Sequence, residues 1–491
     1  MNLKKILENV EFELIKGNLD KEILGIESDS RNIKEGYLFV AINGETVDGH
    51  KFINNAIDNG ASAIIVEQDV DIENEAISII KSKITDRTLL PIIINNFYDF
   101  VSKKLKIIGV TGTNGKSSIT KMLSDAINGN GYETCTMGTI RNTVGNKIIE
   151  SKNTTPGPIE LNEILLKAVN EDIKFVVMEV SSHGLAQKRV AGIDYDIGIF
   201  TNLTNEHMEF HKNMDDYFNA KAKLFEMAKG NVINYDDEYG KKLIKIYKSQ
   251  NKPLLTYGLT EESDIYVKNV EYSYEGTKCT LITPKFETDI FINIPGEIYI
   301  YNTLSVIGAM ALMGYDKEKI VNGINSFKNI NGRFDKVETN TDFDVIVDYA
   351  HSSDALRKVL TEINKFKKGR LITIFGCTGN RDKHKRPIMG SISEELSDIT
   401  ILTSDDIYDE DPEAIIKDIM KGIKDTNKIY HDADRGSAIK IGIDLAKKND
   451  IILIAGKGHE TVIKIGKERI PFNDKNFVLN YLLERKKSDE K

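Results

Sequence analysis

Hydrophobic and polar positions alternate along this chain in short blocks of two kinds. Compact apolar runs, such as LKIIGV ending at Val110 and KFVVMEV ending at Val180, are typical of strands buried on both faces. Other segments, such as SITKMLSDAI, place apolar residues three and four positions apart and predict amphipathic helices. Strands that alternate with helices in this way predict the α/β class, with parallel sheets covered by helices.

The blocks divide the chain into three predicted domains, 1–96, 97–330 and 331–491. The first alternates runs such as GYLFVAI with helical segments, and its stretch IENEAISIIKSKITDRTLL has helical rather than strand periodicity. The second carries the strand and helix alternation of a parallel sheet. The third offers DFDVIVDYA, GRLITIFG, ITILTS and DIILIAGKG as successive buried strands. A length of 491 residues agrees with three domains of roughly 150 residues each.

Composition narrows the classes of function. The chain is 40% hydrophobic and 29% charged, which is ordinary for a globular protein, and its net charge of −9 argues against nucleic-acid binding. No apolar stretch approaches the roughly 18 residues that span a bilayer, and no secretion signal is evident, so we expect a cytoplasmic protein without membrane insertion. Three widely separated cysteines suggest neither a disulfide framework nor a zinc site.

A glycine-rich segment, GVTGTNGKSSIT, joins the apolar run that ends at Val110 to a helical segment. Small residues let backbone N–H groups turn toward phosphate oxygens, and the positive end of the following helix favours an anion. Lys116 adds a point charge and Ser117 can bind magnesium, so the segment predicts a nucleoside triphosphate site. Its spacing departs from G-x-x-x-x-G-K-[ST], because Val110 occupies the first glycine position. The alternative is a tight turn whose glycines serve only the backbone.

Glu179 lies at the carboxyl end of the predicted strand KFVVMEV, where ligands bind in open α/β sheets. A carboxylate there can hold magnesium, although a helix cap or a surface group is the ordinary alternative. The next residues, SSHGLAQKR, bring Ser181, Gln187 and Arg189 into one loop and helix start. This density of polar donors favours an anionic, hydroxyl-rich ligand.

His207 and His211 follow the next predicted strand, YDIGIFTNL. Their spacing imitates half of a zinc site, but the general-base glutamate of H-E-x-x-H is missing, which argues against a zinc protease. His207 is therefore a candidate for a metal ligand or a phosphate contact. The helical segment YFNAKAKLF carries Lys221 and Lys223, which by pattern alone are ordinary surface lysines.

Taken in order, these motifs resemble the Mur ligase family over nearly the whole chain. The resemblance rests on SDSR, TGTNGKS, NTTP, MEVSSHGLAQKR, TNEHMEFH, YFNAKAKLF, YN, GRFD, DYAH, GCTGNRDKHKRP, DEDPEAI and GKGHE. It implies a three-domain architecture with a UDP-precursor-binding domain, a central P-loop ATPase domain built on a parallel sheet, and a Rossmann-like C-terminal domain that binds the amino acid. The motif forms point to the branch that adds the third residue of the peptidoglycan peptide.

The resemblance also implies ATP and Mg²⁺ as cofactors. It implies that ATP is bound by Thr113, Asn114, Gly115, Lys116, Ser117, Asn302, Arg333 and Asp348. The implied catalytic residues are Lys116, Glu179, His207 and Lys221, and the implied magnesium ligands are Ser117, Glu179, His207 and Lys221. Lys221 matches a lysine that is carbamylated in this family, and a carbamate is a carboxylate-like ligand.

The implied reaction joins an amino acid to UDP-N-acetylmuramoyl-L-alanyl-D-glutamate. A substrate carboxylate attacks the γ-phosphate of ATP to form an acyl phosphate, which the incoming amine displaces through a tetrahedral intermediate. The dipeptide substrate would contact Ser28, Ser30, Thr154, Thr155, Ser181, Gln187 and Arg189. The amino acid would contact Arg386, Asp405, Asp406, Tyr408, Gly456 and Glu460. We expect a monomer with small-molecule partners and an active site in the cleft where the three domains meet.

The sequence departs from the family pattern in the predicted amino-acid pocket. The diaminopimelate-adding enzymes carry D-N-P-R there, whereas this chain reads DDIY from Asp405 to Tyr408. Tyrosine cannot replace the fork of an arginine on a carboxylate, and the second aspartate makes the pocket acidic. These two changes predict an acceptor that ends in an ammonium group, such as L-lysine. Milder departures are Glu206 before His207, where aspartate is common, and Tyr299 in place of asparagine.

Two other functions stay open from the sequence. A paralogue could keep the fold and the acyl-phosphate chemistry but join a different acid and amine. A non-catalytic binding protein would be expected to lose one of the four catalytic residues, and this chain retains Lys116, Glu179, His207 and Lys221.

Overall fold

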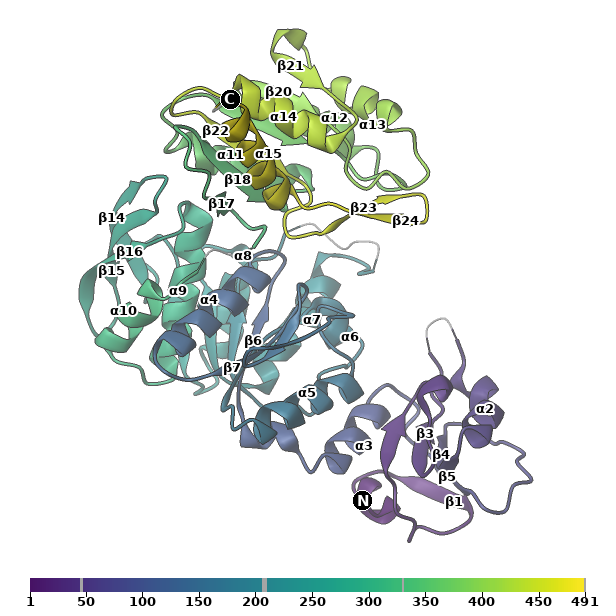
Figure 1. The fold of residues 1–491 in the computed structure, drawn as a ribbon. Helices are drawn as coiled ribbons and strands as arrows, with labels where there is room; N and C mark the ends of the chain where they lie inside the picture. The colour runs from purple at the N-terminus through teal and green to yellow at the C-terminus, as the bar shows by residue number, and fades with distance from the viewer. Residues whose placement is uncertain (45–46, 205–209, 329–330, 490–491) are drawn as a thin grey trace. The chain divides into compact units, whose positions relative to one another are not determined.

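The computed structural model describes residues 1–44, 47–204, 210–328 and 331–489 (Figure 1). Its contacts divide the chain into two compact units. One comprises Met1–Tyr266, Ile282–Phe286 and Tyr301–Ser326, and the other comprises Val267–Leu281, Glu287–Ile300 and Phe327–Lys491. Among the described residues, no helix is both long and apolar enough to cross a lipid bilayer.

The chain begins with a five-stranded sheet in the order β1-β5-β4-β3-β2, in which only β1 runs antiparallel to its neighbour. Its strands are β1 (Phe12–Lys16), β2 (Gly25–Glu27), β3 (Tyr37–Val40), β4 (Ala61–Val66) and β5 (Ser78–Ser82). Apolar residues of β3 alternate between two cores, Leu38 on one face and Phe39 on the other. The face of Leu38 packs on α1 (Leu3–Ile6) and α3 (Leu89–Phe97), and the face of Phe39 packs on α2 (Ile53–Asp58).

Strand β5 corrects the helical interpretation of the segment before α3. Ser78–Ser82 is a strand inserted between β1 and β4, and four of its five side chains are buried. A short run that is buried on both faces has no polar face to reveal its period, so strand and helix cannot be separated by pattern there.

A second sheet has eight strands in the order β13-β12-β11-β6-β10-β7-β8-β9. Its parallel part contains β6 (Lys106–Thr111), β7 (Thr134–Met137), β10 (Phe175–Glu179), β11 (Tyr195–Phe200), β12 (Ala228–Asn234) and β13 (Leu254–Tyr257), and its antiparallel edge contains β8 (Asn142–Val144) and β9 (Lys147–Ile149). The connecting helices are α4 (Lys116–Gly129), α5 (Pro158–Asn170), α6 (Ser182–Ala186), α7 (Met214–Met227) and α8 (Glu238–Tyr247).

The register of the central strands sets the level of their carboxyl ends. On one side of β6, Glu179 of β10 lies opposite Val110, and on the other side Phe200 of β11 lies opposite Thr111. The chain passes from β6 to β7 and β10 on one side and reaches β11 on the other, so the strand order reverses at β6. In open α/β sheets this is where ligands bind.

A three-stranded sheet that the sequence did not predict follows, in the order β14-β15-β16. It contains β14 (Tyr266–Tyr272), β15 (Thr277–Ile282) and β16 (Glu287–Ile292), and the helices after it are α9 (Glu297–Leu312) and α10 (Lys317–Asn325). Exposed and more buried residues alternate along β15 and β16, which is typical of a sheet with one face exposed to solvent.

The last sheet has six strands in the order β17-β18-β22-β19-β20-β21. They are β17 (Asp335–Val337), β18 (Asp344–Asp348), β19 (Leu371–Phe375), β20 (Ile399–Leu402), β21 (Ile429–His431) and β22 (Ile451–Ala455), and only β17 is antiparallel. The four buried strands expected from the sequence are thus present. Around them are α11 (Ser353–Asn364), α12 (Lys385–Leu396), α13 (Pro412–Met420), α14 (Arg435–Leu445), α15 (Asp474–Asp489) and a separate hairpin of β23 (Val462–Ile465) and β24 (Glu468–Pro471).

A buried ion pair joins the first residues of α14 and α15. Arg435 donates from Nε to Oδ1 of Asp474 at 2.7 Å and from Nη2 to Oδ2 at 2.8 Å. The guanidinium also donates to the carbonyls of Ser404 and Ala455, each at 3.1 Å, just beyond β20 and at the end of β22. The pair therefore anchors both helices to the sheet.

We expect Asp474→Ala to destabilise the C-terminal part of the chain by about 3–5 kcal/mol, because it leaves the Arg435 charge buried without its carboxylate. Urea unfolding of the whole chain measures the effect. Asp444→Ala is the matched control, since Asp444 pairs with Arg485 at the surface and its loss should cost less than about 1 kcal/mol. Equal shifts for the two variants would contradict the anchoring role.

Candidate active site

The glycine-rich segment forms a tight loop between β6 and α4. Gly112 has a φ of +151°, and a Cβ added to it would lie 1.8 Å from Oγ1 of Thr201. Gly115 has a φ of +90° and is the N-cap residue of α4. Both positions therefore need glycine, one for close approach to β11 and one for its backbone conformation. The loop delivers the N-terminus of a fourteen-residue helix to the carboxyl edge of the sheet.

Two lysine ammonium groups meet on one carbonyl of this loop. Lys116 Nζ donates to Gly112 O at 2.9 Å and to Thr113 O at 2.8 Å, and Lys221 Nζ donates to Gly112 O at 2.8 Å. Lys221 is only 1% exposed, and its Nζ lies 4.6 Å from the centre of the Tyr217 ring. The pattern alone suggested a surface lysine, and the structure buries it instead. Two ammonium groups therefore lie beside the glycine-rich loop.

Glu179 is held at the end of β10 by the turn that follows β7. Its Oε1 accepts the backbone N–H of Thr139 at 2.9 Å, and its Oε2 accepts the Thr139 hydroxyl at 3.0 Å. A Cβ on Gly138 would come within 2.2 Å of Oε1, so a glycine is needed beside the carboxylate. The side chain is 2% exposed, which makes it an oriented group and not a surface charge.

The remaining loop residues surround the same edge. The Thr113 hydroxyl lies 3.2 Å from the Tyr217 hydroxyl and accepts the N–H of Thr204 at 3.0 Å. Asn114 is exposed, and Ser117 lies half-buried in the first turn of α4. The predicted ligand His207 lies outside the described residues.

Asn302 of α9 points a buried amide toward the loop. The side chain is 4% exposed, and its Oδ1 is 3.1 Å from the place where a Cβ of Gly115 would be. Its Nδ2 is buried and has no hydrogen-bond partner. Buried donors are nearly always satisfied, so this amide is a candidate donor to a ligand at the loop.

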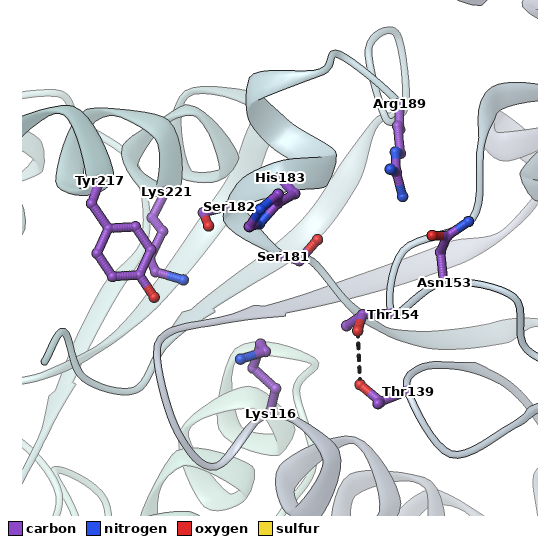
Figure 2. A pocket seen from close by; sticks show the side chains of 10 residues that line it. All are labelled: Lys116, Thr139, Asn153, Thr154, Ser181, Ser182, His183, Arg189, Tyr217 and Lys221. Atoms are coloured by element: carbon purple, nitrogen blue, oxygen red, sulfur yellow. Dashed lines mark hydrogen bonds between the residues drawn. The ribbon is translucent and has the colours of Figure 1, made fainter. Parts of the chain in front are cut away.

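A polar cavity of about 370 Å³ opens beside the two lysines (Figure 2). The hydroxyl oxygens of Thr139 and Thr154 lie 3.0 Å apart in its wall, and Ser181, which also lines it, lies 3.0 Å from the hydroxyl of the buried Thr155. Arg189 lies at the opposite side from Lys116 in Figure 2. The residues that line the cavity are Lys116, Thr139, Asn153, Thr154, Ser181, Ser182, His183, Arg189, Tyr217 and Lys221.

Three of the seven residues predicted to bind the dipeptide substrate line the cavity: Thr154, Ser181 and Arg189. Arg189 donates to Gln187 Oε1 from Nε at 2.9 Å and to Thr155 O from Nη1 at 3.0 Å, so these two neighbours orient its guanidinium. Ser28 and Ser30 do not line the cavity: they follow β2 in the N-terminal sheet, and Ser30 is 5% exposed.

Thr139 and Tyr217 are site residues that the sequence analysis missed. Tyr217 precedes Lys221 by one helical turn, so a test for partners at i, i+4 would have found it. Thr139 follows β7 and meets Glu179 only because β7 and β10 are paired, and no local pattern signals that.

In the second unit, the predicted nucleotide contacts Arg333 and Asp348 lie near one another. Asp348 accepts the N–H groups of Phe334 at 2.7 Å and Ala350 at 2.8 Å. Burial raises the pKa of Asp348, and the Arg333 charge and these two N–H groups oppose that shift. The Arg333 guanidinium stacks 4.6 Å from the centre of the Tyr349 ring.

The GKGHE segment packs against the same region. Gly332 has a φ of +69°, and a Cβ on it would lie 2.0 Å from His459 N. Burial, followed by the charges of Arg333 and Lys457, lowers the pKa of His459 to about 4, so this imidazole is neutral near pH 7. Gly456 has a φ of +115° and approaches Asp405, whose Oδ2 would be 2.7 Å from an added Cβ.

Asp406, one of the predicted acceptor contacts, already has two cationic partners. Its Oδ1 accepts Lys457 Nζ at 2.7 Å, and its Oδ2 accepts Lys464 Nζ at 2.8 Å. Burial would raise its pKa, but the hydrogen bonds from the two ammonium groups outweigh burial and lower it. Lys457 also reaches Glu460 at 2.6 Å and Asp405 at 3.7 Å. The acidic pocket expected from the sequence is therefore largely neutralised.

Arg386 and Tyr408 differ from their expected surroundings. Arg386 is 0% exposed, and its Nη groups bind Glu410 and Asp418, so it braces α12 against α13 and their preceding loop. Both Nη groups are therefore engaged within the protein, whereas the buried Nε has no hydrogen-bond partner, and the contact of Arg386 with the amino acid stays a prediction. Tyr408 has a φ of +50° and bridges to Ile465 of the β23–β24 hairpin.

Comparison with known proteins agrees with this architecture. Residues 22–95 match the Mur ligase family, catalytic domain; residues 110–310 match the Mur ligase middle domain; and residues 332–458 match the Mur ligase, glutamate ligase domain. The chain is 43% identical to UDP-N-acetylmuramoyl-L-alanyl-D-glutamate--2,6-diaminopimelate ligase 1 of Clostridium acetobutylicum, across 99% of this chain and 100% of that protein. It is also 43% identical to the corresponding ligase of Clostridioides difficile, across 97% and 98%.

Solved structures give the same picture. A UDP-N-acetylmuramoyl-L-alanyl-D-glutamate--2,6-diaminopimelate ligase superposes with a TM-score of 0.75 at 29% identity, over 99% of both chains. MurF from Acinetobacter baumannii superposes with a TM-score of 0.66 at 16% identity over 98% of both chains, a likeness of fold alone. The expected three-domain α/β fold is thus confirmed, and the chain belongs to the Mur ligase family of ATP-dependent, ADP-forming ligases that serve peptidoglycan synthesis.

Proposed function

We propose that this protein adds the third amino acid to UDP-N-acetylmuramoyl-L-alanyl-D-glutamate. The observation that carries the proposal is the meeting of Lys116 and Lys221 on the Gly112 carbonyl, at the edge of a cavity lined with hydroxyls and Arg189. Acyl phosphate formation brings the ATP phosphates close to the substrate carboxylate. The positive side chains at this edge of the sheet can attract both groups. The relatives at 43% identity are named for the same dipeptide substrate.

The residues at the loop fit a magnesium ion. Mg²⁺ prefers oxygen ligands and is usually held by one or two carboxylates together with substrate phosphates. Glu179 supplies an oriented carboxylate, and Ser117 supplies a hydroxyl. When bound, the ion would neutralise charge on the ATP phosphates. His207 remains a predicted ligand beyond the described residues.

Lys221 is the proposed site of carbamylation. Among the described residues, no three His, Cys, Asp or Glu side chains gather into a metal-binding group, so further oxygen ligands have to come from elsewhere. A carbamate on Lys221 would place two oxygens beside the loop, in a setting that is already buried and bordered by Tyr217. The modification reverses the charge of a side chain that now donates to Gly112 O.

ATP would place its phosphates on the loop from Thr113 to Ser117 and its base near Asn302, whose buried Nδ2 has an open hydrogen-bonding position. Arg333 and Asp348 are the proposed contacts in the C-terminal domain. Three domains, 1–96, 97–330 and 331–491, around one cleft remain part of the proposal, with the uridine end near Ser28 and Ser30. We further propose a cytoplasmic monomer, and its three buried, unpaired cysteines suit a reducing compartment.

The chemistry follows from these positions. The γ-carboxylate or α-carboxylate of the D-glutamyl residue attacks the γ-phosphorus of ATP, the bond to the β-phosphate oxygen breaks, and ADP leaves. The amine of the acceptor then attacks the acyl carbon, and phosphate departs from the tetrahedral intermediate. Lys116 would counter the charge on the transferring phosphoryl group, and the cavity hydroxyls and Arg189 would hold the dipeptide in line.

For the acceptor we propose meso-diaminopimelate in place of the L-lysine-like amine that the sequence predicted. The prediction rested on Asp406 and Tyr408, and Asp406 is occupied by Lys457 and Lys464. Both acceptors carry a distal ammonium group, but only meso-diaminopimelate adds a distal carboxylate that the positive charges of Lys457 and Lys464 can attract. The names of the relatives agree with a diaminopimelate acceptor.

The first test supplies ATP, UDP-N-acetylmuramoyl-L-alanyl-D-glutamate and a panel of amino acids, and measures phosphate release and the product mass. We expect turnover with meso-diaminopimelate and far less with L-lysine. Release without the dipeptide, or with a different acid only, would favour a paralogue that joins another acid and amine.

Lys116→Ala should lower kcat by about 10³-fold, because the transferring phosphoryl group loses its point charge. Phosphate release under saturating substrates gives the rate. Lys223→Ala is the control, since Lys223 is exposed on the same helix as Lys221 and should keep the rate of the unmodified enzyme. A Lys116→Ala variant with full activity would remove Lys116 from the reaction.

Lys221→Ala should also inactivate the enzyme, and millimolar formate or acetate should restore part of the activity by standing in for the carbamate. Intact mass measurement at neutral pH with ¹³C-bicarbonate detects the modification itself. If carboxylic acids rescue Lys116→Ala equally, the effect is not specific to a carbamate at position 221.

A further inference from the structure

The hairpin of β23 and β24 brings a partly exposed lysine to the predicted amino-acid pocket. Backbone N–H groups of Ile407 and Tyr408 donate to Lys464 O at 3.1 and 3.2 Å, and Gly466 N donates to Tyr408 O at 2.8 Å. These bonds tie the DDIY segment to the hairpin. Position 464 is therefore held beside Tyr408. Tyr408 is the position at which diaminopimelate-adding enzymes carry an arginine, according to the resemblance.

The Lys464 side chain is charged and held in place. Its Nζ donates to Asp406 Oδ2 at 2.8 Å and lies 5.8 Å from the centre of the Tyr408 ring. The hydrogen bond to Asp406 raises the pKa of Lys464. An ammonium has three donors, and the side chain is 28% exposed, so it can meet a ligand without leaving Asp406.

The neighbouring cations are less suited to meet a ligand. Lys457 is 1% exposed and is surrounded by Asp405, Asp406 and Glu460. Arg386 is buried between Glu410 and Asp418. In the described part of this pocket, Lys464 thus combines exposure, a fixed position and a retained positive charge.

We propose that Lys464 recognises the distal carboxylate of the acceptor and so determines specificity for a diamino-dicarboxylic acid. The proposal rests on the proposed function, since it assigns one contact of that same reaction. L-Lysine has the same carbon chain up to the distal amine but lacks the distal carboxylate, so it cannot use this contact. Asp406 positions the ammonium, and Tyr408 supplies an aromatic face beside it.

The test compares kcat/KM for meso-diaminopimelate with kcat/KM for L-lysine, using the full chain, ATP and the UDP-muramoyl dipeptide. Lys464→Met should lower the ratio by about 10- to 100-fold, the range expected for a lost charge-assisted hydrogen bond, mainly through KM for meso-diaminopimelate. KM for the dipeptide should not change. Lys464→Arg should retain most of the ratio.

Two further variants separate recognition from folding. Lys467→Met removes an exposed lysine at the turn of the same hairpin and should leave the ratio unchanged. Tyr408→Arg in the Lys464→Met background should recover part of the ratio, because a guanidinium then stands beside the vacated position. A purely structural lysine would lower activity with both amino acids and would leave their ratio constant.

The outcomes distinguish this proposal from the proposed function. If the unmodified enzyme uses neither amino acid with the dipeptide, the proposed function fails. If it prefers L-lysine, the acceptor assignment and the role of Lys464 both fail. If it prefers meso-diaminopimelate and Lys464→Met keeps the ratio, only the role of Lys464 is overturned, and the exposed Arg381 of the neighbouring loop becomes the next candidate.

Discussion

The placement of β6 between β10 and β11 is the constraint on which the site depends. It sets Glu179 and Thr201 on either side of the glycine-rich loop and fixes the level at which each strand ends. Gly112 can approach β11 only because it lacks a Cβ, and its carbonyl is thereby turned toward Lys116 and Lys221. The strand order thus determines which side chains lie at the carboxyl edge of this sheet.

Features that depend on local pattern could be predicted from the sequence. The glycine-rich loop, Glu179 at a strand end and the strands of the C-terminal sheet all follow from contiguous residues. The strand Ser78–Ser82 could not be separated from a helix, because burial on both faces erases the polar positions that reveal a period. The three-stranded sheet beginning at Tyr266 was missed, since its first strand alternates weakly and no motif marks it.

Charge in the predicted amino-acid pocket shows a different limit of sequence reasoning. The two aspartates at 405 and 406 read as an acidic site because their partners are distant in the chain. Lys457 and Lys464 reach Asp406 across 51 and 58 residues, and only the packed hairpin brings them there. Arg386 shows the converse, since both Nη groups of this motif residue are paired with Glu410 and Asp418, which the sequence does not reveal. The net charge of a pocket therefore depends on which distant residues the tertiary structure brings to it.

The hairpin of β23 and β24 belongs to none of the larger sheets. Its strands pair only with each other and are joined to the DDIY segment by backbone hydrogen bonds, whereas a Cβ at Gly112 would collide with Thr201 after β11. The phosphate loop is thus confined by its own backbone, while backbone hydrogen bonds leave the side chains of the hairpin less constrained. Under the proposed role of Lys464, a side-chain change on this hairpin would alter the preferred amino acid and leave the phosphate loop unchanged.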